Sequence, residues 1–286
     1  MPCERKELAE HLLKDERVSV HRACRVTGAT RSMFYYRSHR DDTEVREKLG
    51  SLATSHPNRG FDCYYGRIRT EGLEWNRKRV LRVYRGMRLV MRRKHRRRLP
   101  ERIREPLAQP VAANFTWSMD FMHDVLGNGR KVRVFNVLDD HSREAVAVRA
   151  ERSFPAERVV EVLEQLSRDR GLPRRIRVDN GPEFISHVFT QWCASKGVEI
   201  HHIQPGKPAQ NAYIERFNRT FREDVLDAYI FDDIEQLRLM AERWAYDYNH
   251  NHPHTALGGM APIQYRLQGE KGRAPFPPVK TTNHLI

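Results

Sequence analysis

Cysteine is scarce in this chain of 286 residues, and its four copies form no recognisable motif. Structural zinc sites and redox sites place pairs of cysteines a few residues apart. Here the cysteines stand far from one another, which argues against a disulfide framework and against a CxxC zinc site. A reduced, cytoplasmic protein fits this usage best. The four positions are Cys3, Cys24, Cys63 and Cys193.

Long apolar runs are also absent. No segment approaches the ~18 consecutive apolar residues that a membrane-spanning helix needs, and no apolar segment follows the charged N-terminus. We therefore expect neither a membrane protein nor a secreted one. With 39% hydrophobic residues and no evident internal repeat, the chain is long enough for about two domains and at least one sizeable core.

Acidic residues are too few in the first third of the chain to balance the basic ones. Residues 1–106 hold 28 Lys and Arg against 14 Asp and Glu, whereas residues 107–286 hold 23 of each. The whole net charge of +14 thus lies in the first third. A segregated excess predicts a polyanion-binding region joined to a neutral body. Nucleic acid is the expected polyanion, because Lys and Arg that neutralise phosphates release condensed counterions.

Two short helices are expected within the first 40 residues. Ser19 can cap the first, the pair Thr27-Gly28 can turn the chain, and Thr30 can cap the second. Two short helices around a glycine turn form a helix-turn-helix candidate, although simple helical hairpins have the same pattern. Residues 41–55 are polar and predict a linker or a solvated helix.

A second helical unit begins near residue 56 and includes a strongly basic helix. Asn76 is a good N-cap, and apolar residues then recur at helical spacing from Val80 to Met87. The opposite face of this helix is basic, so it is either an ordinary solvated face or a surface that faces phosphates. The charged residues on this opposite face are Lys78, Arg82 and Arg85.

The densest basic run follows, from Met91 to Arg104. Prolines at positions 100, 106 and 110 predict an extended linker here rather than a long helix. Such a run can also be a nuclear-targeting signal. Its place between two structured regions favours a linker that follows DNA. The candidate DNA contacts are Arg92, Arg93, Lys94, Arg96, Arg97 and Arg98.

From residue 115 onward the pattern is that of a mixed α/β domain. Three strands come first and helices then alternate with short strands, which predicts one five-stranded sheet flanked by helices. The strands are expected at 116–125, 132–138, 144–148, 175–178 and 198–201. The helices are expected from 156 onward, at 186–195 and at 209–229.

Three acids in this neutral domain differ from the solvated ones. Asp120 lies inside an apolar strand, Asp179 ends another, and Glu215 borders the apolar stripe of the last long helix. Taken singly, each has a structural explanation: a capping or paired acid, an Asx-turn, or a surface ion pair. Brought together, three carboxylates would raise one another's pKa unless a cation neutralised them. Mg²⁺ prefers such oxygen ligands, and two such ions can promote phosphodiester chemistry.

The segments around these acids resemble a known signature. Asp120 in WSMDFM, Asp179 in DNGPEF and Glu215 in GKPAQNAYIERFNRTFRED resemble the Asp-Asp-Glu (DDE) signature of retroviral-integrase-like transposases, with 35 residues between the second and third acids. More closely, the chain resembles the catalytic protein (OrfB) of a large family of bacterial insertion sequences, over nearly its whole length. The other matching elements are His56-Pro57, Asn76 to Arg79, VLDDHSREAV at 137–146, Trp244, Asp247 to Asn249, and His252 to Tyr265.

This resemblance implies a fold and a site. The fold would be an RNase H-like catalytic core, preceded by small all-α DNA-binding modules. Asp120, Asp179 and Glu215 would be the ligands of two Mg²⁺ ions, with Mn²⁺ as a substitute. Asp139 and Asp140 fall in the family's hairpin turn and are given a structural role. The residues implied to lie along the DNA beside the site are Lys207, Gln210, Asn211 and Arg219.

The resemblance also implies a reaction and partners. The enzyme would cleave one strand at the ends of its own insertion sequence, and the freed 3′-hydroxyl would then attack a second phosphodiester in strand transfer. The implied partners are double-stranded DNA (terminal inverted repeats and target), an upstream OrfA-type protein or its frameshift fusion, and further copies in a DNA-dependent homo-oligomer. The implied location is the bacterial cytoplasm, at the nucleoid.

Rival hypotheses remain open at this point. The chain could be a non-catalytic, element-encoded DNA-binding regulator, a catalytic half that requires its upstream partner, or a general nuclease on the same fold.

The expected organisation has four segments: a helix-turn-helix-like module at 1–45, a basic helical module with linker at 46–106, the catalytic core with a C-terminal helix at 107–268, and a flexible tail at 269–286.

Overall fold

A computed structural model of the chain describes residues 2–15, 18–36, 41–90, 107, 109–204 and 208–270. The chain divides into two compact units, one up to residue 47 and one from residue 48 onward. The basic run at 91–104, Lys207 and residues 271–286 of the expected tail lie outside the described residues.

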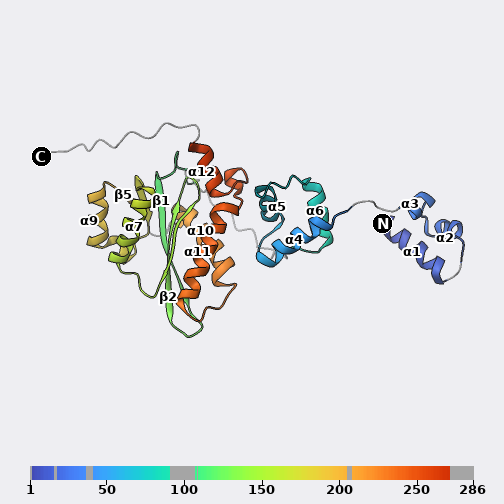
Figure 1. Cartoon of the computed structure of the whole chain (residues 1–286), viewed down its shortest axis with the longest axis horizontal. Coiled ribbons are helices and arrows are strands. Elements are labelled where there is room, and N and C mark those ends of the chain that lie inside the picture. Colours follow the sequence, from blue (N-terminus) through green and yellow to red (C-terminus); the bar gives the residue numbers. More distant parts are fainter. Residues whose placement is uncertain are drawn as a thin grey trace. The chain divides into compact units, whose positions relative to one another are not determined.

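The first unit contains the expected pair of short helices, preceded by another. The side chain of Ser19 accepts a hydrogen bond from the backbone N–H of Arg22, and that of Thr30 accepts one from Met33. Gly28 follows the first of the pair with a φ of 67°, a left-handed conformation that glycine adopts without strain. The three helices are α1 (Pro2–Asp15), α2 (Val20–Thr27) and α3 (Arg31–Tyr35) (Figure 1).

The segment 41–55 contains the helix that was one of its two expected forms, but this helix is not fully solvated. The segment is α4 (Thr43–Ser55), and its residues Leu49 and Leu52 are buried. The two leucines lie three residues apart, which places them on one buried face of the helix. The polar composition of the segment hid this narrow apolar stripe.

The basic helix is the second of the next two helices, α5 (Phe61–Thr70) and α6 (Arg77–Gly86). As expected, Asn76 caps α6, accepting a hydrogen bond from the backbone N–H of Lys78 at 2.8 Å. The apolar face of α6 is buried through Val80 and Val83. Lys78, Arg82 and Arg85 are exposed on its other face.

Ion pairs and a close contact link the region of α5 to the C-terminal helices of the same unit. Arg67, with a side chain 7% exposed, donates two hydrogen bonds to Asp247, at 3.0 and 2.7 Å. Arg59 lies 2.6 Å from a carboxylate oxygen of Asp224. Gly66 packs so closely on Pro253 that an added Cβ would lie 2.5 Å from the proline ring, so only glycine fits there.

A five-stranded mixed sheet forms the centre of the second unit, in the order β3-β2-β1-β4-β5. β1, β2 and β3 are antiparallel neighbours, whereas β4 runs parallel to both β1 and β5. The number and order of strands along the chain agree with the sequence prediction. The strands are β1 (Thr116–Val125), β2 (Lys131–Asp139), β3 (Ala145–Glu151), β4 (Arg175–Val178) and β5 (Glu199–His202).

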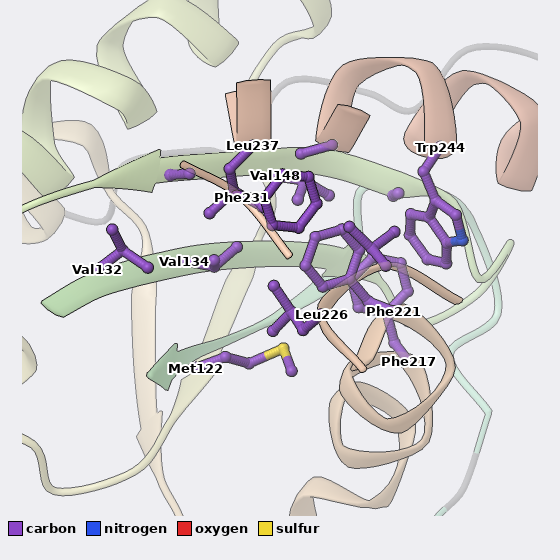
Figure 2. Packing of buried hydrophobic residues seen from close by; sticks show 14 of the residues in the cluster. Met122, Val132, Val134, Val148, Phe217, Phe221, Leu226, Phe231, Leu237 and Trp244 are labelled. Atoms are coloured by element: carbon purple, nitrogen blue, oxygen red, sulfur yellow. The ribbon is translucent and has the colours of Figure 1, made fainter. Parts of the chain in front are cut away.

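Helices cover both faces of the sheet, and each face has its own apolar core (Figure 1). Trp117 and Phe135 belong to the core under α7 (Ala156–Arg170) and α9 (His187–Lys196), while α8 (Pro182–Ile185) lies beside α9. Met122 and Val134 pack on the other face, under Phe217, Phe221 and Trp244 (Figure 2). These aromatic residues belong to α10 (Ala212–Phe221) and α11 (Ile234–Asn251).

The prediction of a single α-helix at 209–229 is wrong, because this segment contains a 3₁₀ turn, an α-helix and a π-helical turn in succession. A 3₁₀ turn, η1 (Pro208–Asn211), precedes α10, and a π-helical turn, η2 (Arg222–Leu226), follows it. The backbone N–H of Asp227 donates to the carbonyl of Arg222 at 2.8 Å, five residues back. This wider turn places the neighbouring residues Val225 and Leu226 both in the core.

The described chain ends in two short helices, η3 (Thr255–Leu257) and α12 (Pro262–Glu270). Residues 269 and 270 of the expected tail are the last two of α12. In the part of the chain that the structure describes, no helix combines the length and apolar composition needed to cross a membrane.

Candidate active site

Asp120 lies in the middle of β1, on the face of the sheet that α10 and α11 cover. Side chains alternate along a strand, so Asp120 shares this face with Met122 of the core beneath α10. Both of its carboxylate oxygens accept a hydrogen bond. Oδ1 accepts from the backbone N–H of Phe121 and Oδ2 from Nδ2 of Asn218, each at 2.8 Å. The acid inside this apolar strand is therefore partnered.

Asp179 directly follows β4 and is half-buried. Its Oδ1 accepts a hydrogen bond from the backbone N–H of Gly181 at 3.0 Å, which is the Asx-turn that the sequence allows. A Cβ on Gly181 would lie 3.0 Å from the same oxygen, so a glycine lets the backbone approach the carboxylate this closely. The turn thus fixes the orientation of Asp179.

Glu215 is exposed on α10, whose next turn reaches Asp120. Ile214 and Phe217 bury the apolar side of the helix, which turns Glu215 away from the core. Asn218 lies three residues after Glu215, on a neighbouring part of the helix surface, and donates to Asp120. Its Oδ1 in turn accepts from Nδ2 of Asn136, the residue opposite Asp120 on β2, at 2.7 Å.

The three acids interact electrostatically. Burial is the main cause that raises the pKa of Asp120 to about 6, and the negative charges of Asp179 and Glu215 contribute to the same rise. The hydrogen bonds from Phe121 and Asn218 act in the opposite direction, because they stabilise the charged carboxylate. The structure therefore brings Asp120 within electrostatic range of both other acids.

The donor chemistry of this site suits a hard divalent cation, since carboxylate oxygens are the ligands that Mg²⁺ prefers. A cation would also remove the repulsion that raises the pKa of Asp120. Among the described residues, however, no three His, Cys, Asp or Glu side chains are gathered closely enough to hold a metal ion. Asp120 lies within electrostatic range of the other two acids, but the three side chains are not close enough together to coordinate one ion.

Asp139 is the last residue of β2 and Asp140 begins the turn that follows, and both are fully buried. Asp139 accepts hydrogen bonds from the backbone N–H groups of Asn114, His141 and Ser142. Asp140 instead contacts two strands, through Ser118 on β1 and Arg177 on β4. Burial raises the pKa of Asp140 to about 6, and the neighbouring Arg177 and Ser118 oppose that rise.

Four polar residues around the acids were not predicted. Asn136 and Arg177 are polar positions inside apolar strands, which is the signal that could have singled them out. Asn218 is separated from Glu215 by one helical turn, and Ser118 precedes Asp120 on the same face of β1. Their partners, however, follow from strand pairing and helix docking, which a single sequence does not give.

The expected DNA-binding residues have varied surroundings. Lys78, Arg82 and Arg85 are exposed on α6, and Arg219 is exposed on α10, one turn after Glu215. Gln210 accepts a hydrogen bond from the backbone N–H of Gln204 at 2.9 Å. Asn211 is only 3% exposed, and its Oδ1 has no hydrogen-bond partner among the described residues. The residues outside the described part are Arg92, Arg93, Lys94, Arg96, Arg97, Arg98 and Lys207.

Comparison with known proteins agrees with this geometry. Two integrase core domain families match the chain, at residues 110–208 and 196–262. A 31.7 kDa protein of insertion element IS407 from Burkholderia multivorans is 38% identical over 250 residues, covering 87% of this chain and 90% of the relative. The chain belongs to the insertion-sequence transposases with an integrase core.

Other relatives of this transposase support the same assignment. A 39.2 kDa protein of insertion element IS476 from Xanthomonas euvesicatoria is 34% identical and covers 97% of the chain and 82% of the relative. The transposase InsD of Escherichia coli insertion element IS2 is 28% identical over 80% of each chain. The relatives support a transposase, an enzyme of the nuclease and strand-transferase class, and do not favour a non-catalytic regulator.

The fold also has a solved counterpart. A chain of the simian T-cell lymphotropic virus intasome, solved in complex with a regulatory subunit of PP2A, has a TM-score of 0.50 at 16% identity, covering 84% of this chain and 79% of that one. Such a likeness concerns the fold. The five-stranded mixed sheet with helices on both faces is therefore the RNase H-like integrase core that the resemblance implied.

Proposed function

We propose that this transposase cleaves DNA at the ends of its own insertion sequence and joins the freed ends to a second DNA, with Asp120, Asp179 and Glu215 as its catalytic carboxylates. The observation that supports this assignment is the effect of the other two acids on Asp120, whose pKa both of them raise. Neighbouring carboxylates repel one another, and a cation bound between them would remove that repulsion. The divalent metal ions that promote phosphodiester chemistry would be such cations.

We assign the three carboxylates as the ligands of divalent cations, two Mg²⁺ ions for which Mn²⁺ can substitute. Asp120, Asp179 and Glu215 would each supply carboxylate oxygens to hold these ions. When bound, such ions activate the attacking hydroxyl and stabilise the leaving oxygen. Carboxylate oxygens suit both metals, which share a preference for hard ligands.

The protein's own contribution is the orientation of these acids. The amide of Asn218 and the backbone N–H of Phe121 orient the carboxylate of Asp120, and the backbone N–H of Gly181 orients that of Asp179. Glu215 is exposed and Asp179 is half-buried, so a phosphodiester can reach them from solvent. Buried polar contacts thus hold the inner acid, while the outer two remain accessible to DNA.

We propose that basic residues outside the acid site bind the DNA backbone. Arg219 lies one turn from Glu215 and would contact phosphates next to the reacting bond. The exposed basic face of α6 would bind DNA further away, through Lys78, Arg82 and Arg85. Contacts by the basic run at 92–98, by Lys207, and by Gln210 and Asn211 remain predictions from the sequence.

The reaction also defines the partners that we propose. They are double-stranded DNA, in the form of terminal inverted repeats and target, and further copies of this chain, because two ends must be handled together. An upstream OrfA-type protein would add recognition of the ends. Adding such a protein to this chain, and measuring whether end binding tightens, tests that part of the proposal separately.

A strand-transfer assay tests the catalytic assignment. A labelled element end is incubated with the full chain in Mg²⁺ or in EDTA, and wild type is compared with Glu215→Ala and with Arg216→Ala, an exposed neighbour on the same helix. We expect joined products only with metal and only when Glu215 is present, with end binding retained in all proteins. Full activity of Glu215→Ala would refute the assignment.

A further inference from the structure

The parallel pairing of β1 with β4 stops just before the catalytic aspartates. The paired residues are Thr116 with Arg175, Trp117 with Ile176, and Ser118 with Arg177. Asp120 lies two residues beyond the last of these pairs on one strand, and Asp179 lies two residues beyond it on the other. The β1–β4 backbone ladder therefore ends before the acids that we assign to the metal ions.

A buried carboxylate joins the two strands at that last pair. Oδ1 of Asp140 accepts a hydrogen bond from the hydroxyl of Ser118, and Oδ2 accepts one from the guanidinium of Arg177, both at 2.6 Å. We call these three residues the Asp140 bridge. Ser118 and Asp140 are fully buried and Arg177 is 7% exposed, so water does not compete for these bonds.

The Asp140 bridge lies on the same side of the sheet as the acid site. Alternate residues of a strand point to the same face, so Ser118 shares its face with Asp120. The backbone of Asp140 is also attached to β1, because its N–H donates to the carbonyl of Thr116 at 3.0 Å. Asp140 thus holds β1 through both backbone and side chain, and holds β4 through an ion pair.

We propose that Asp140 is a positioning residue for catalysis, which sets the distance between Asp120 and Asp179 by joining β1 to β4 at their last pair. This inference rests on the assignment of those two aspartates as catalytic. The ordinary alternative is that Asp140 only stabilises the turn after β2. Both hypotheses predict a loss of stability on substitution, so the test needs a second readout.

The chain provides a matched control in the preceding residue. Asp139, the last residue of β2, is fully buried and also lies near an arginine, Arg170, at 3.4 Å. Its side chain, however, binds the backbone of Asn114 and of the turn itself, and neither Ser118 nor Arg177 is among its hydrogen-bond partners. Asp139→Asn therefore disturbs the same turn while leaving the Asp140 bridge in place.

The experiment compares Asp140→Asn with Asp139→Asn in the full chain, with Ser118→Ala as a milder variant that removes one hydroxyl from the bridge. Thermal unfolding gives the stability of each protein, and measurements are made at a temperature where all are folded. Binding of Mn²⁺ is followed by the loss of the free-ion paramagnetic resonance signal, with Asp120→Asn defining the background. Strand transfer is then measured against Mg²⁺ concentration.

We expect Asp140→Asn to weaken Mn²⁺ binding and to lower strand transfer on the order of tenfold to a hundredfold, because misplaced ligands lose affinity and rate together. Ser118→Ala should show a smaller loss of the same kind. Asp139→Asn should lose stability but keep its Mn²⁺ affinity. DNA-end binding should stay within about twofold of wild type in all three, since the basic surfaces are unchanged.

Two results would overturn the inference. One is that Asp140→Asn and Ser118→Ala both bind Mn²⁺ as tightly as wild type does. If Asp140→Asn fails to fold, wild-type Mn²⁺ affinity of Ser118→Ala is sufficient for this result. The other is an equal loss of Mn²⁺ affinity in Asp139→Asn, which would make the effect a general one of the turn. Full activity of Asp120→Asn would instead refute the catalytic assignment itself, so the two failures are distinguishable.

Discussion

Asn218 donates a hydrogen bond from Nδ2 to Oδ2 of Asp120 over 2.8 Å, and so connects the helix that carries Glu215 to the strand that carries Asp120. The other end of the same amide accepts from Asn136, which is fully buried on β2. A chain of two amides therefore fixes which oxygen of Asp120 faces the helix. The position of Glu215 relative to Asp120 depends on this contact.

The first prediction concerns this amide. Asn218→Asp keeps the size of the side chain but replaces the donor with a second carboxylate, which repels Asp120 and raises its pKa further. We expect strand transfer to fall on the order of tenfold to a hundredfold, as for other residues that orient metal ligands. The measurement is strand transfer at saturating DNA. Asn218→Ser, a smaller uncharged change, should be less severe, and equal activity of wild type and Asn218→Asp would contradict the prediction.

The second prediction concerns the contact between α5 and α11. Asp247→Asn leaves the guanidinium of Arg67 buried without its charged partner, and we expect the free energy of unfolding to fall by about 2 kcal/mol, less than for a fully buried pair because Asp247 is one-third exposed. Urea unfolding measures this loss. Asp62→Asn breaks an ion pair with Arg77 at the same distance of 2.7 Å but on the surface, and should cost about 0.5 kcal/mol or less.

A pH dependence of stability follows from two buried histidines. Burial lowers the pKa of His252 well below its ordinary value, and lowers that of His254 to about 3. Both are neutral in the folded chain but take up a proton on unfolding below pH 6.5. Both therefore lower the free energy of unfolding as the pH falls below 6.5, and His254 does so by up to about 1.4 kcal/mol per pH unit until the pH approaches 3.

Comparison of variants isolates this effect, because Asp120 and Asp140 oppose it. Their raised pKa values mean that the folded chain binds protons near pH 6, which stabilises it as the pH falls. His254→Phe keeps an aromatic ring beside Tyr248 and removes one titrating group. Its unfolding free energy should decline less steeply than that of wild type between pH 6.5 and 5. Parallel declines in the two proteins would show that His254 does not contribute.

The fourth prediction concerns salt. If Lys78, Arg82 and Arg85 bind phosphates, their joint replacement by Ala should reduce the slope of log affinity against log salt by about 0.9 for each phosphate that is no longer neutralised. The measurement is DNA binding between low and physiological salt. Arg168→Ala, an exposed change on α7, is the control and should leave the slope unchanged. An unaltered slope in the triple variant would make the basic face of α6 an ordinary solvated surface.

Much of the catalytic fold was predictable, because its strands are short apolar segments bounded by polar turns. The predicted bounds of β1 and β4 are those of the structure, and the other three strands shift by up to three residues. The π turn after α10 was not predictable, since Ile214, Phe217, Phe221 and Val225 fit an ordinary helix equally well. Its wider winding becomes visible only when Leu226 is also found in the core.

The sequence predicts the three acids of the candidate site but not the residues that support them, and the catalytic role of the acids stays a prediction. Asp120, Asp179 and Glu215 stand in motifs that a sequence displays directly. The roles of Asn136 and Ser118 depend on which strand residues lie opposite or beside them, and alternation alone does not fix that register. Asp139 and Asp140 were given one structural role between them, whereas their side chains bind different parts of the fold.

The π turn has a consequence for how this chain tolerates change in length. A π turn winds more widely than an α-helical turn and holds one residue more between the same end points, so it can absorb a change of one residue in length. Deleting one residue from 222–226 would restore an α-helical path while leaving Glu215 and Asn218 untouched. Deleting residue 216 or 217 within α10 would instead rotate Asn218 by about 100° relative to Glu215 and separate the acid from its supporting amide. Length variation among relatives of this transposase is thus expected at η2 and not within α10.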